Sequence, residues 1–272
     1  MSSTVSVHLR RAAAVLALAV AVPLACAQTA STQAASSQAT SASATPETIA
    51  LKKALEAKFP GVSITHMAKT NYLGLYEVMF DDKLIYTDAK ANYIIVGSIY
   101  DANTKTNLTE ARSRKLNRVA IDKLPMDLAF KRVKGNGERK LIVFSDADCP
   151  FCHRLEQEMK GLDNVTIYTF LFPIDQLHPE AASKSKKIWC APDRVTAWNQ
   201  FFESGTVPDN AGDCGDPVAQ TQALGASLRI SATPTLVFAD GTIVPGALPL
   251  AQIEQEMTSA EAEAKKIAAT KP

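Results

Sequence analysis

The chain lacks an excess of charge of either sign. Its 29 Lys and Arg residues are balanced by 28 Asp and Glu residues, which leaves a formal net charge of +1 at pH 7. Proteins that bind nucleic acids or anionic membranes usually carry a concentrated basic field. The composition therefore disfavours polyanions, and we expect no nucleic acid as a partner.

Long hydrophobic runs are scarce as well. The clearest one covers residues 12–24, follows two arginines and precedes the small-x-small sequence Ala25-Cys26-Ala27. It is shorter than the roughly 20 residues of a transmembrane helix, but its length and flanks are typical of an export signal. We predict that residues 1–27 are removed by cleavage after Ala27 and that the mature protein is soluble. The alternative is a lipoprotein signal that keeps Cys26 as the acylated first residue, but Pro23 lies where such signals have an aliphatic residue.

Cysteine is rare. The chain has 5 cysteines, and loss of Cys26 with the signal leaves an even number in an oxidising compartment, where structural disulfides persist. Cys149 and Cys152 form a local C-x-x-C pair, and Cys190 and Cys214 are the second pair. Other connectivities are formally possible, as is simple burial of Cys190 and Cys214. We expect a structural disulfide between Cys190 and Cys214, worth about 3 kcal/mol in the chain-entropy model.

The shortage of metal ligands bears on the C-x-x-C motif, which is also half of many zinc sites. A structural zinc site usually has a second close pair of ligands, whereas Cys190 and Cys214 lie far apart in the sequence. His153 and His178 are the alternative ligands, although His153 is expected to be exposed on a helix. We therefore predict no metal, and no cofactor other than the redox-active Cys149–Cys152 pair.

What the sequence does contain is a C-x-x-C, Cys149-Pro150-Phe151-Cys152, between a strand and a helix. Residues 140–144 are apolar and β-branched, which predicts a buried strand, and residues 145–148 form a polar turn. Pro150 fits the first position of a helix, and Gly161 supplies its stop. The apolar face of this helix is expected to contain Phe151, Leu155 and Met159.

Cys149 therefore lies at the N-terminus of a helix. Unpaired N–H groups and the helix dipole stabilise negative charge there, so the pKa of the Cys149 thiol is expected below the free value of about 8.5, within about 3.5–7.5. This predicts that Cys149 is the nucleophile and that Cys152, one turn further on, is the resolving thiol. His153 favours the thiolate and Asp146 and Asp148 oppose it, so their net effect is open.

The first part of the mature chain is predicted to be a disordered leader, followed by a small domain. Residues 28–45 contain almost only Ala, Ser, Thr and Gln, and residues 46–106 combine one helix with an antiparallel meander. The β-rich runs are residues 62–65, 72–80, 84–87 and 93–100. The helix begins after Thr45, and its apolar face is expected to contain Ile49, Leu51, Leu55 and Phe59. A core this thin favours dimerisation through this domain.

Residues 107–127 are predicted to be a linker helix. Asn107 begins a sequence that resembles a capping box, and Pro125 ends or kinks the helix. Its basic residues are expected to form a solvated face and not a binding patch. They are Arg112, Arg114, Lys115 and Arg118.

Residues 128–272 are predicted to form an α/β thioredoxin-like domain. After the C-x-x-C helix come a strand at residues 165–172, a helical insertion at 175–228, a hairpin that turns at Asp240-Gly241, and a last helix from about Leu250. The aromatic residues of the insertion are expected in the core. They are Trp189, Trp198, Phe201 and Phe202.

Two motifs of this domain resemble the active site of thioredoxin-fold enzymes, in which a cis-proline loop faces the C-x-x-C. They are Cys149-Pro150-Phe151-Cys152 and, before the hairpin, Ala232-Thr233-Pro234-Thr235. The resemblance implies a cis bond at Pro234. It also implies that the backbone of Thr233 and Pro234, together with Phe151, contacts a substrate peptide.

The whole pattern resembles the bacterial periplasmic disulfide isomerases of the DsbC/DsbG family. It combines an export signal, a small β domain, a linker helix, the C-x-x-C, Ile188-Trp189-Cys190, Cys214, and the sequence of residues 241–246. The resemblance implies a periplasmic homodimer that holds misfolded proteins in a cleft, and a DsbD-type inner-membrane reductase as partner. Cys190 and Cys214 favour the DsbC branch, whereas Pro150-Phe151 is nearer the DsbG dipeptide.

We therefore expect a thiol:disulfide interchange enzyme that isomerises wrong disulfides through a reduced Cys149. A DsbG-like reductase of oxidised single cysteines uses the same thiolate and is the nearer alternative. A holdase chaperone, which binds unfolded chains without chemistry, is the alternative from another class.

Overall fold

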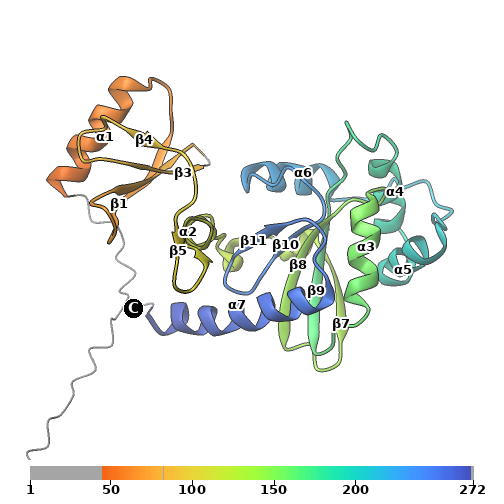
Figure 1. The fold of residues 1–272 in the computed structure, drawn as a ribbon. Helices are drawn as coiled ribbons and strands as arrows, with labels where there is room; N and C mark the ends of the chain where they lie inside the picture. Colours follow the sequence, from red (N-terminus) through yellow and green to blue (C-terminus); the bar gives the residue numbers. More distant parts are fainter. Residues whose placement is uncertain (1–44, 82, 271–272) are drawn as a thin grey trace, which may run out of the picture. The chain divides into compact units, whose positions relative to one another are not determined.

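A computed structural model describes residues 45–81 and 83–270 (Figure 1). The predicted export signal at residues 1–27 lies outside the described residues, and so does the predicted leader apart from Thr45. The described chain contains a four-stranded sheet, a five-stranded sheet and a two-stranded ribbon. Within this part of the chain, no helix is both long and apolar enough to cross a membrane.

Helix α1 (Pro46–Lys58) begins where the sequence predicts it, but its buried face is narrower. The Thr45 side chain accepts a hydrogen bond from the backbone N–H of Thr48 at 3.2 Å and caps the helix. Leu51 and Leu55 are buried one turn apart. They pack against the first sheet.

Two residues of the predicted apolar face of α1 are exposed, so that prediction is wrong for them. Ile49 is 59 % exposed and Phe59 is 39 % exposed. A step of two residues turns an α-helix by about 200°, which puts Ile49 on the side opposite to Leu51. Phe59 is the C-cap residue, with φ −129° and ψ 75°, and so no longer follows the helical period.

The first sheet is the predicted antiparallel meander, with its strands in sequence order. Its strands are β1 (Ile64–Lys69), β2 (Tyr76–Phe80), β3 (Lys83–Thr87) and β4 (Ile94–Ile95). Val78 and Ile85 share a core with the two leucines of α1. The ribbon that follows, β5 (Tyr100–Asp101) with β6 (Thr106–Asn107), was not predicted.

Helix α2 (Leu108–Leu116) is shorter than the predicted linker helix. Asn107 caps it by accepting a hydrogen bond from the backbone N–H of Glu110 at 3.0 Å, and Asn117 is its C-cap. The rest of the linker contains two short 3-10 turns. They are η1 (Ile121–Lys123) and η2 (Met126–Leu128).

The basic residues of the linker are not a solvated face, so that prediction is wrong for three of the four. The ion pairs are Arg112–Glu77 at 2.7 Å, Arg114–Glu256 at 2.7 Å and Arg118–Asp240 at 2.6 Å. Each acidic partner lies far from its arginine in the sequence, so the pattern along the linker does not reveal it. Lys115 is exposed, as expected.

The second sheet is the predicted thioredoxin-like sheet, with strand order β11-β10-β8-β9-β7. Its strands are β7 (Phe130–Lys134), β8 (Arg139–Ser145), β9 (Val165–Leu171), β10 (Thr235–Val237) and β11 (Ile243–Pro245). β8 and β9 are parallel, with α3 (Pro150–Met159) as the crossover between them. The edge strand β7 was not predicted, because three of its five residues are basic and dilute the apolar signal.

The remaining helices occupy the predicted insertion and the C-terminus (Figure 1). They are α4 (Ala181–Trp189), α5 (Arg194–Ser204), α6 (Val218–Ser227) and α7 (Leu250–Thr270). The four aromatic residues of the insertion are buried, as predicted.

Alternating residues of β8 face two separate cores. Leu141 and Val143 pack with α3 and α7, whereas Ile142 and Phe144 pack with residues of the linker and α6. All four side chains are fully buried, as the continuous apolar sequence predicts. This central strand fixes the place where α3 begins.

The buried face of α3 differs from the predicted one at Phe151. Cys152, Leu155, Glu156 and Met159 are buried, but Phe151 is 60 % exposed. The buried positions follow the i, i+3, i+4, i+7 period of one helix face, and Phe151 lies about 100° outside it. Phe151 is therefore a surface residue beside Cys149.

The turn between β10 and β11 contacts the linker. Gly241 has φ +85°, and a Cβ there would lie 2.1 Å from the carbonyl oxygen of Val119. The Val119 N–H donates to the carbonyl oxygen of Gly241 at 2.9 Å. This position therefore needs glycine both for the turn and for the close approach of the linker backbone.

Candidate active site

Cys149 is the N-cap residue of α3, in the loop that follows the carboxyl end of β8. Its N–H donates to the carbonyl oxygen of Asp146 at 3.3 Å, and its own carbonyl accepts from the N–H of Cys152 at 3.0 Å. Cys149 is 4 % exposed, and Cys152 is fully buried. Of the two thiols, Cys149 is therefore the one that a substrate reaches first.

A second segment lies against Cys149, although it is 84 residues away in the sequence. The Thr233–Pro234 bond is cis, and the Cys149 thiol donates to the carbonyl oxygen of Thr233 at 3.3 Å. The Pro234 carbonyl accepts from the N–H of Gly246 at 2.7 Å, which ties the loop to the end of β11. This hydrogen bond holds the Pro234 end of the loop in place.

The two thiols differ strongly in acidity. The hydrogen bond from the Cys152 thiol lowers the pKa of Cys149 to about 5; burial opposes this shift, while Thr233 and the N–H groups of Cys152 and Phe151 add to it. Burial raises the pKa of Cys152, and its hydrogen bond to Cys149 raises it further. At neutral pH, Cys149 is therefore a thiolate and Cys152 a thiol.

Each of the two acids before Cys149 has a basic partner. Nδ1 of His178 lies 2.8 Å from Oδ2 of Asp146, whose side chain is fully buried. Nζ of Lys184 lies 2.8 Å from Oδ1 of Asp148. Neither partner was predicted, because 32 and 36 residues separate them from their acids. One signal was present: both follow β9, which is parallel to β8 and so ends at the same edge of the sheet.

His153 is not the exposed helix residue that the sequence predicted. It is half-buried, its Nε2 lies 3.2 Å from the carbonyl oxygen of Ala147, and its ring centroid lies 4.3 Å from that of Phe202. The ring therefore packs under the active-site loop, and its one recorded polar contact is a backbone carbonyl.

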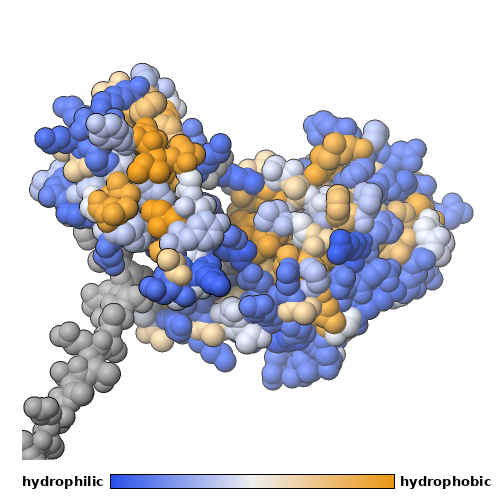
Figure 2. Space-filling view, in the orientation of Figure 1, coloured by the Kyte–Doolittle hydropathy of each residue, from blue (hydrophilic) through white to orange (hydrophobic). Residues whose placement is uncertain are grey.

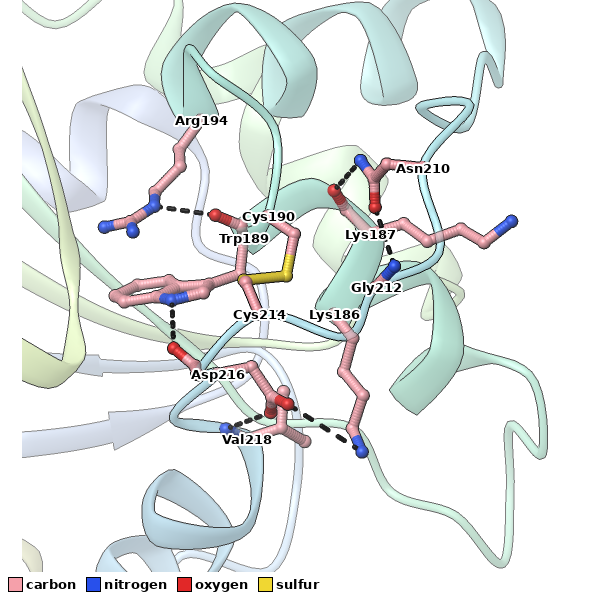
Figure 3. The surroundings of a disulfide bond; sticks show 11 residues. Lys186, Lys187, Trp189, Cys190, Arg194, Asn210, Gly212, Cys214, Asp216 and Val218 are labelled. Carbon is pink, nitrogen blue, oxygen red and sulfur yellow. Dashed lines mark hydrogen bonds and ion pairs between the residues drawn. A yellow bond between two sulfur atoms is a disulfide. The ribbon is translucent and has the colours of Figure 1, made fainter.

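Cys190 and Cys214 form a disulfide, with a Cα–Cα distance of 5.7 Å (Figure 3). Trp189 donates through Nε1 to the carbonyl oxygen of Gly215 at 3.2 Å, and the Arg194 guanidinium lies 3.8 Å from the Trp189 ring centroid. The bridge thus joins the end of α4 to the segment that leads into α6. Cys149 and Cys152 are free thiols.

Metal ligands do not gather at this site. Among the residues that the structure describes, no group of three or more His, Cys, Asp or Glu side chains is placed to hold a metal ion. His153 and His178, which were considered as ligands, contact a backbone carbonyl and the Asp146 carboxylate instead.

Two protein families match the chain. A thioredoxin-like domain family matches residues 126–261, and a family described as the disulfide bond isomerase protein N-terminal domain matches residues 32–110. The first range overlaps the predicted catalytic domain at 128–272, and the second overlaps the predicted small domain at 46–106 and begins within the predicted leader at 28–45.

Curated relatives match across both of these regions. The chain is 39 % identical over 212 residues to the probable thiol:disulfide interchange protein DsbC of Bordetella parapertussis, which covers 78 % of this chain and 75 % of that protein. It is 27 % identical over 208 residues to the thiol:disulfide interchange protein DsbC of Escherichia coli K12, covering 73 % and 86 %. A crystal structure of a disulfide interchange protein from Neisseria gonorrhoeae shares 44 % identity with a TM-score of 0.49, covering 50 % of this chain and 98 % of that one.

Proposed function

Because this chain belongs to the DsbC family of thiol:disulfide interchange proteins, we propose that it isomerises wrong disulfides of exported proteins through Cys149. The chain is a thiol:disulfide interchange enzyme with a thioredoxin-like catalytic domain. The observation that supports isomerisation in particular is the unequal acidity of the two thiols. Cys149 is a thiolate, and the neighbouring Cys152 is protonated.

The Cys149 thiolate attacks one sulfur of a substrate disulfide. A bond forms between Cys149 Sγ and that sulfur, the substrate S–S bond breaks, and its electron pair leaves with the other sulfur as a thiolate. A second substrate thiolate then attacks the mixed disulfide, makes a new substrate disulfide and releases the Cys149 thiolate. Nothing is oxidised or reduced overall, so isomerisation consumes no reductant.

Cys152 provides the route out of a stalled mixed disulfide. Once deprotonated, it attacks Cys149 Sγ, releases the substrate sulfur as a thiolate and leaves an oxidised Cys149–Cys152 pair. Because burial raises the pKa of Cys152, this step is slower than attack by an ionised substrate thiol. The oxidised pair then needs two electrons from a dithiol, and we assign that role to a DsbD-type inner-membrane reductase.

The substrate chain is proposed to lie between Phe151 and the Thr233–Pro234 loop. Phe151 is 60 % exposed next to Cys149, so its ring is available to an apolar side chain beside the attacked cysteine. The Thr233 carbonyl contacts the Cys149 thiol, and the backbone of Thr233 and Pro234 is proposed to pair with an extended peptide as an edge strand would.

The small N-terminal domain is proposed to form a homodimer. β4 is the end strand of its sheet, and the apolar residues at and around it are exposed. They are Tyr93, Ile95, Val96 and Tyr100, exposed by 74 %, 46 %, 72 % and 61 %. Figure 2 shows apolar side chains gathered on this domain. An exposed apolar end strand is an edge that proteins cover, and a second copy of this domain covers it symmetrically.

The periplasm is the proposed place of action. The predicted export signal at residues 1–27 supports this location, and the Cys190–Cys214 disulfide suits an oxidising compartment. In such a compartment the reduced state of Cys149 and Cys152 depends on the proposed reductase.

Recovery of scrambled ribonuclease tests the function. Cys149→Ala should abolish recovery, whereas Cys152→Ala should keep isomerising and lose the ability to reduce insulin. A reductase of oxidised single cysteines would need both thiols, so loss of recovery in Cys152→Ala would favour it. A holdase would suppress aggregation without thiols, and recovery by Cys149→Ala at the wild-type rate would refute the thiol mechanism.

A further inference from the structure

A buried carboxylate lies at the base of the C-x-x-C. The Asp146 side chain is fully buried and accepts hydrogen bonds from the N–H of Asp148 at 2.9 Å, the N–H of Ile174 at 2.8 Å and Nδ1 of His178 at 2.8 Å. The Asp146 backbone meets both thiols: its carbonyl accepts from the Cys149 N–H at 3.3 Å, and its N–H donates to the Cys152 sulfur at 3.4 Å.

The buried Asp146 carboxylate and the Cys149 thiolate therefore belong to one short loop. A buried carboxylate disfavours a second anion beside it, and three residues along the loop Cys149 is a thiolate. Something must therefore offset the charge of Asp146. Two of its three donors are neutral backbone groups, and the third is His178.

Two charged groups on the segments next to His178, Lys184 and Asp175, have partners of their own. Lys184 of α4 bonds Asp148 at 2.8 Å and Glu180 at 3.2 Å, so its charge is shared between those two acids. Asp175, on the same loop as His178, accepts a hydrogen bond from Gln222 of α6 at 3.1 Å. Among the described residues, His178 is therefore the basic side chain that directly contacts the buried acid.

We propose that His178, held as an imidazolium on Asp146, neutralises this buried carboxylate and so keeps Cys149 ionised and nucleophilic. In the described structure His178 bonds Asp146 and neither of the reacting sulfurs, so it is proposed as a positioning residue that acts through Asp146. The inference rests on the proposed function, in which Cys149 is the nucleophile. The hydrogen bond with Asp146 raises the pKa of His178 against the effect of burial, and the charges of Asp146, Cys149 and Asp148 raise it further.

Three variants of the full chain separate charge from shape. His178→Gln removes the positive charge but keeps a polar side chain, whereas His178→Lys keeps the charge on a different shape. Asp146→Asn combined with His178→Gln removes both charges. His66→Gln is the matched control, since His66 lies 2.8 Å from another buried carboxylate, that of Glu77, in the four-stranded sheet.

The readout is the midpoint of the ultraviolet thiolate absorbance of the reduced C-x-x-C against pH. In His178→Gln we expect the Cys149 midpoint to rise by roughly one pH unit, the effect of an uncompensated neighbouring charge. His178→Lys, the double variant and His66→Gln should stay close to the wild-type midpoint. At about pH 4, where Cys149 is only partly ionised, iodoacetamide alkylation should be slower in His178→Gln than in the wild type, whereas the other variants should react at close to the wild-type rate.

The outcomes decide between three readings of the site. An unchanged midpoint in His178→Gln would overturn the inference, and so would equal rises in His178→Gln and His178→Lys, which would point to shape. If Asp146→Asn prevents folding, the comparison of the Gln and Lys variants decides alone. A wild-type midpoint near that of a free thiol would instead overturn the proposed role of Cys149.

Discussion

The sulfur of Cys149 lies 3.3 Å from the carbonyl oxygen of Thr233, with the thiol as the hydrogen-bond donor. Ionisation of Cys149 removes that donor, because a thiolate can only accept. The Thr233 carbonyl then has a free lone pair at the moment when the nucleophile becomes active. Under the proposed function, we expect a backbone N–H of the substrate to replace the thiol as donor, so that ionisation of Cys149 frees the acceptor that the peptide would use.

The first prediction concerns the ionisation of Cys149. Its thiolate should titrate with a midpoint of about 5, and its alkylation rate should fall roughly tenfold per pH unit below that value. Cys152→Ala should raise the midpoint, because the Cys152 thiol is the largest cause of the lowered pKa. Ultraviolet thiolate absorbance measures both. A midpoint that is the same with and without Cys152 would contradict the assigned cause.

The second prediction concerns the Cys190–Cys214 disulfide. Replacing both cysteines by Ala should lower the free energy of unfolding by about 2–4 kcal/mol, since the bridge restrains a loop with a sequence separation of 24 in the unfolded chain. Urea unfolding measures the change. Insulin reduction should persist, because Cys149 and Cys152 are untouched. An unfolding midpoint equal to that of the wild type would show that the bridge is not structural.

The third prediction concerns the exposed apolar residues of the N-terminal domain. Ile95→Asp and Val96→Asp should yield a monomer by sedimentation, because each puts a charge into the proposed dimer interface. The monomer should still reduce insulin and should recover far less scrambled ribonuclease. Val133→Asp is the control, since Val133 is 56 % exposed on the edge strand β7 of the other sheet. A dimer that survives both substitutions would rule out this surface.

The fourth prediction compares two glycines with positive φ. Gly241→Ala and Gly246→Ala both force alanine into the left-handed region, at a cost of about 1–2 kcal/mol. Only at Gly241 does the added Cβ clash, 2.1 Å from the Val119 carbonyl, whereas at Gly246 it meets nothing within 4 Å. Gly241→Ala should therefore be the more destabilising of the two by urea unfolding. Equal losses would mean that the linker simply moves aside.

The sequence predicted those parts of the fold whose signals are local. The strand at β8, the proline at the start of α3, and the Asp240-Gly241 turn are each set by a few consecutive residues, and the structure has all three. Burial was less predictable, because a hydrophobic residue one helical step outside the packed face looks the same in the sequence. Ile49 and Phe151 are the examples, and both are exposed.

Only the parts of the site that are short sequence motifs could be predicted from the sequence. The C-x-x-C and the Thr233–Pro234 loop were recognised, but the charge partners His178 and Lys184 were not. Their contacts with Asp146 and Asp148 arise because two parallel strands end side by side, which brings together loops that are 32 and 36 residues apart. Arg118 and its partner Asp240 were missed because the linker and the β10–β11 turn, which the fold brings together, lie far apart in the sequence.

The β10–β11 hairpin has a mechanical consequence. The Thr233–Pro234 loop leads directly into β10, which spans only Thr235–Val237, and the turn beyond it is bonded to Val119 of the linker. A strand of three residues is only about 10 Å long. The loop that touches Cys149 is therefore separated from the attachment point of the linker by one short strand and one turn, so we expect a displacement of Val119 to reach the Thr233–Pro234 loop.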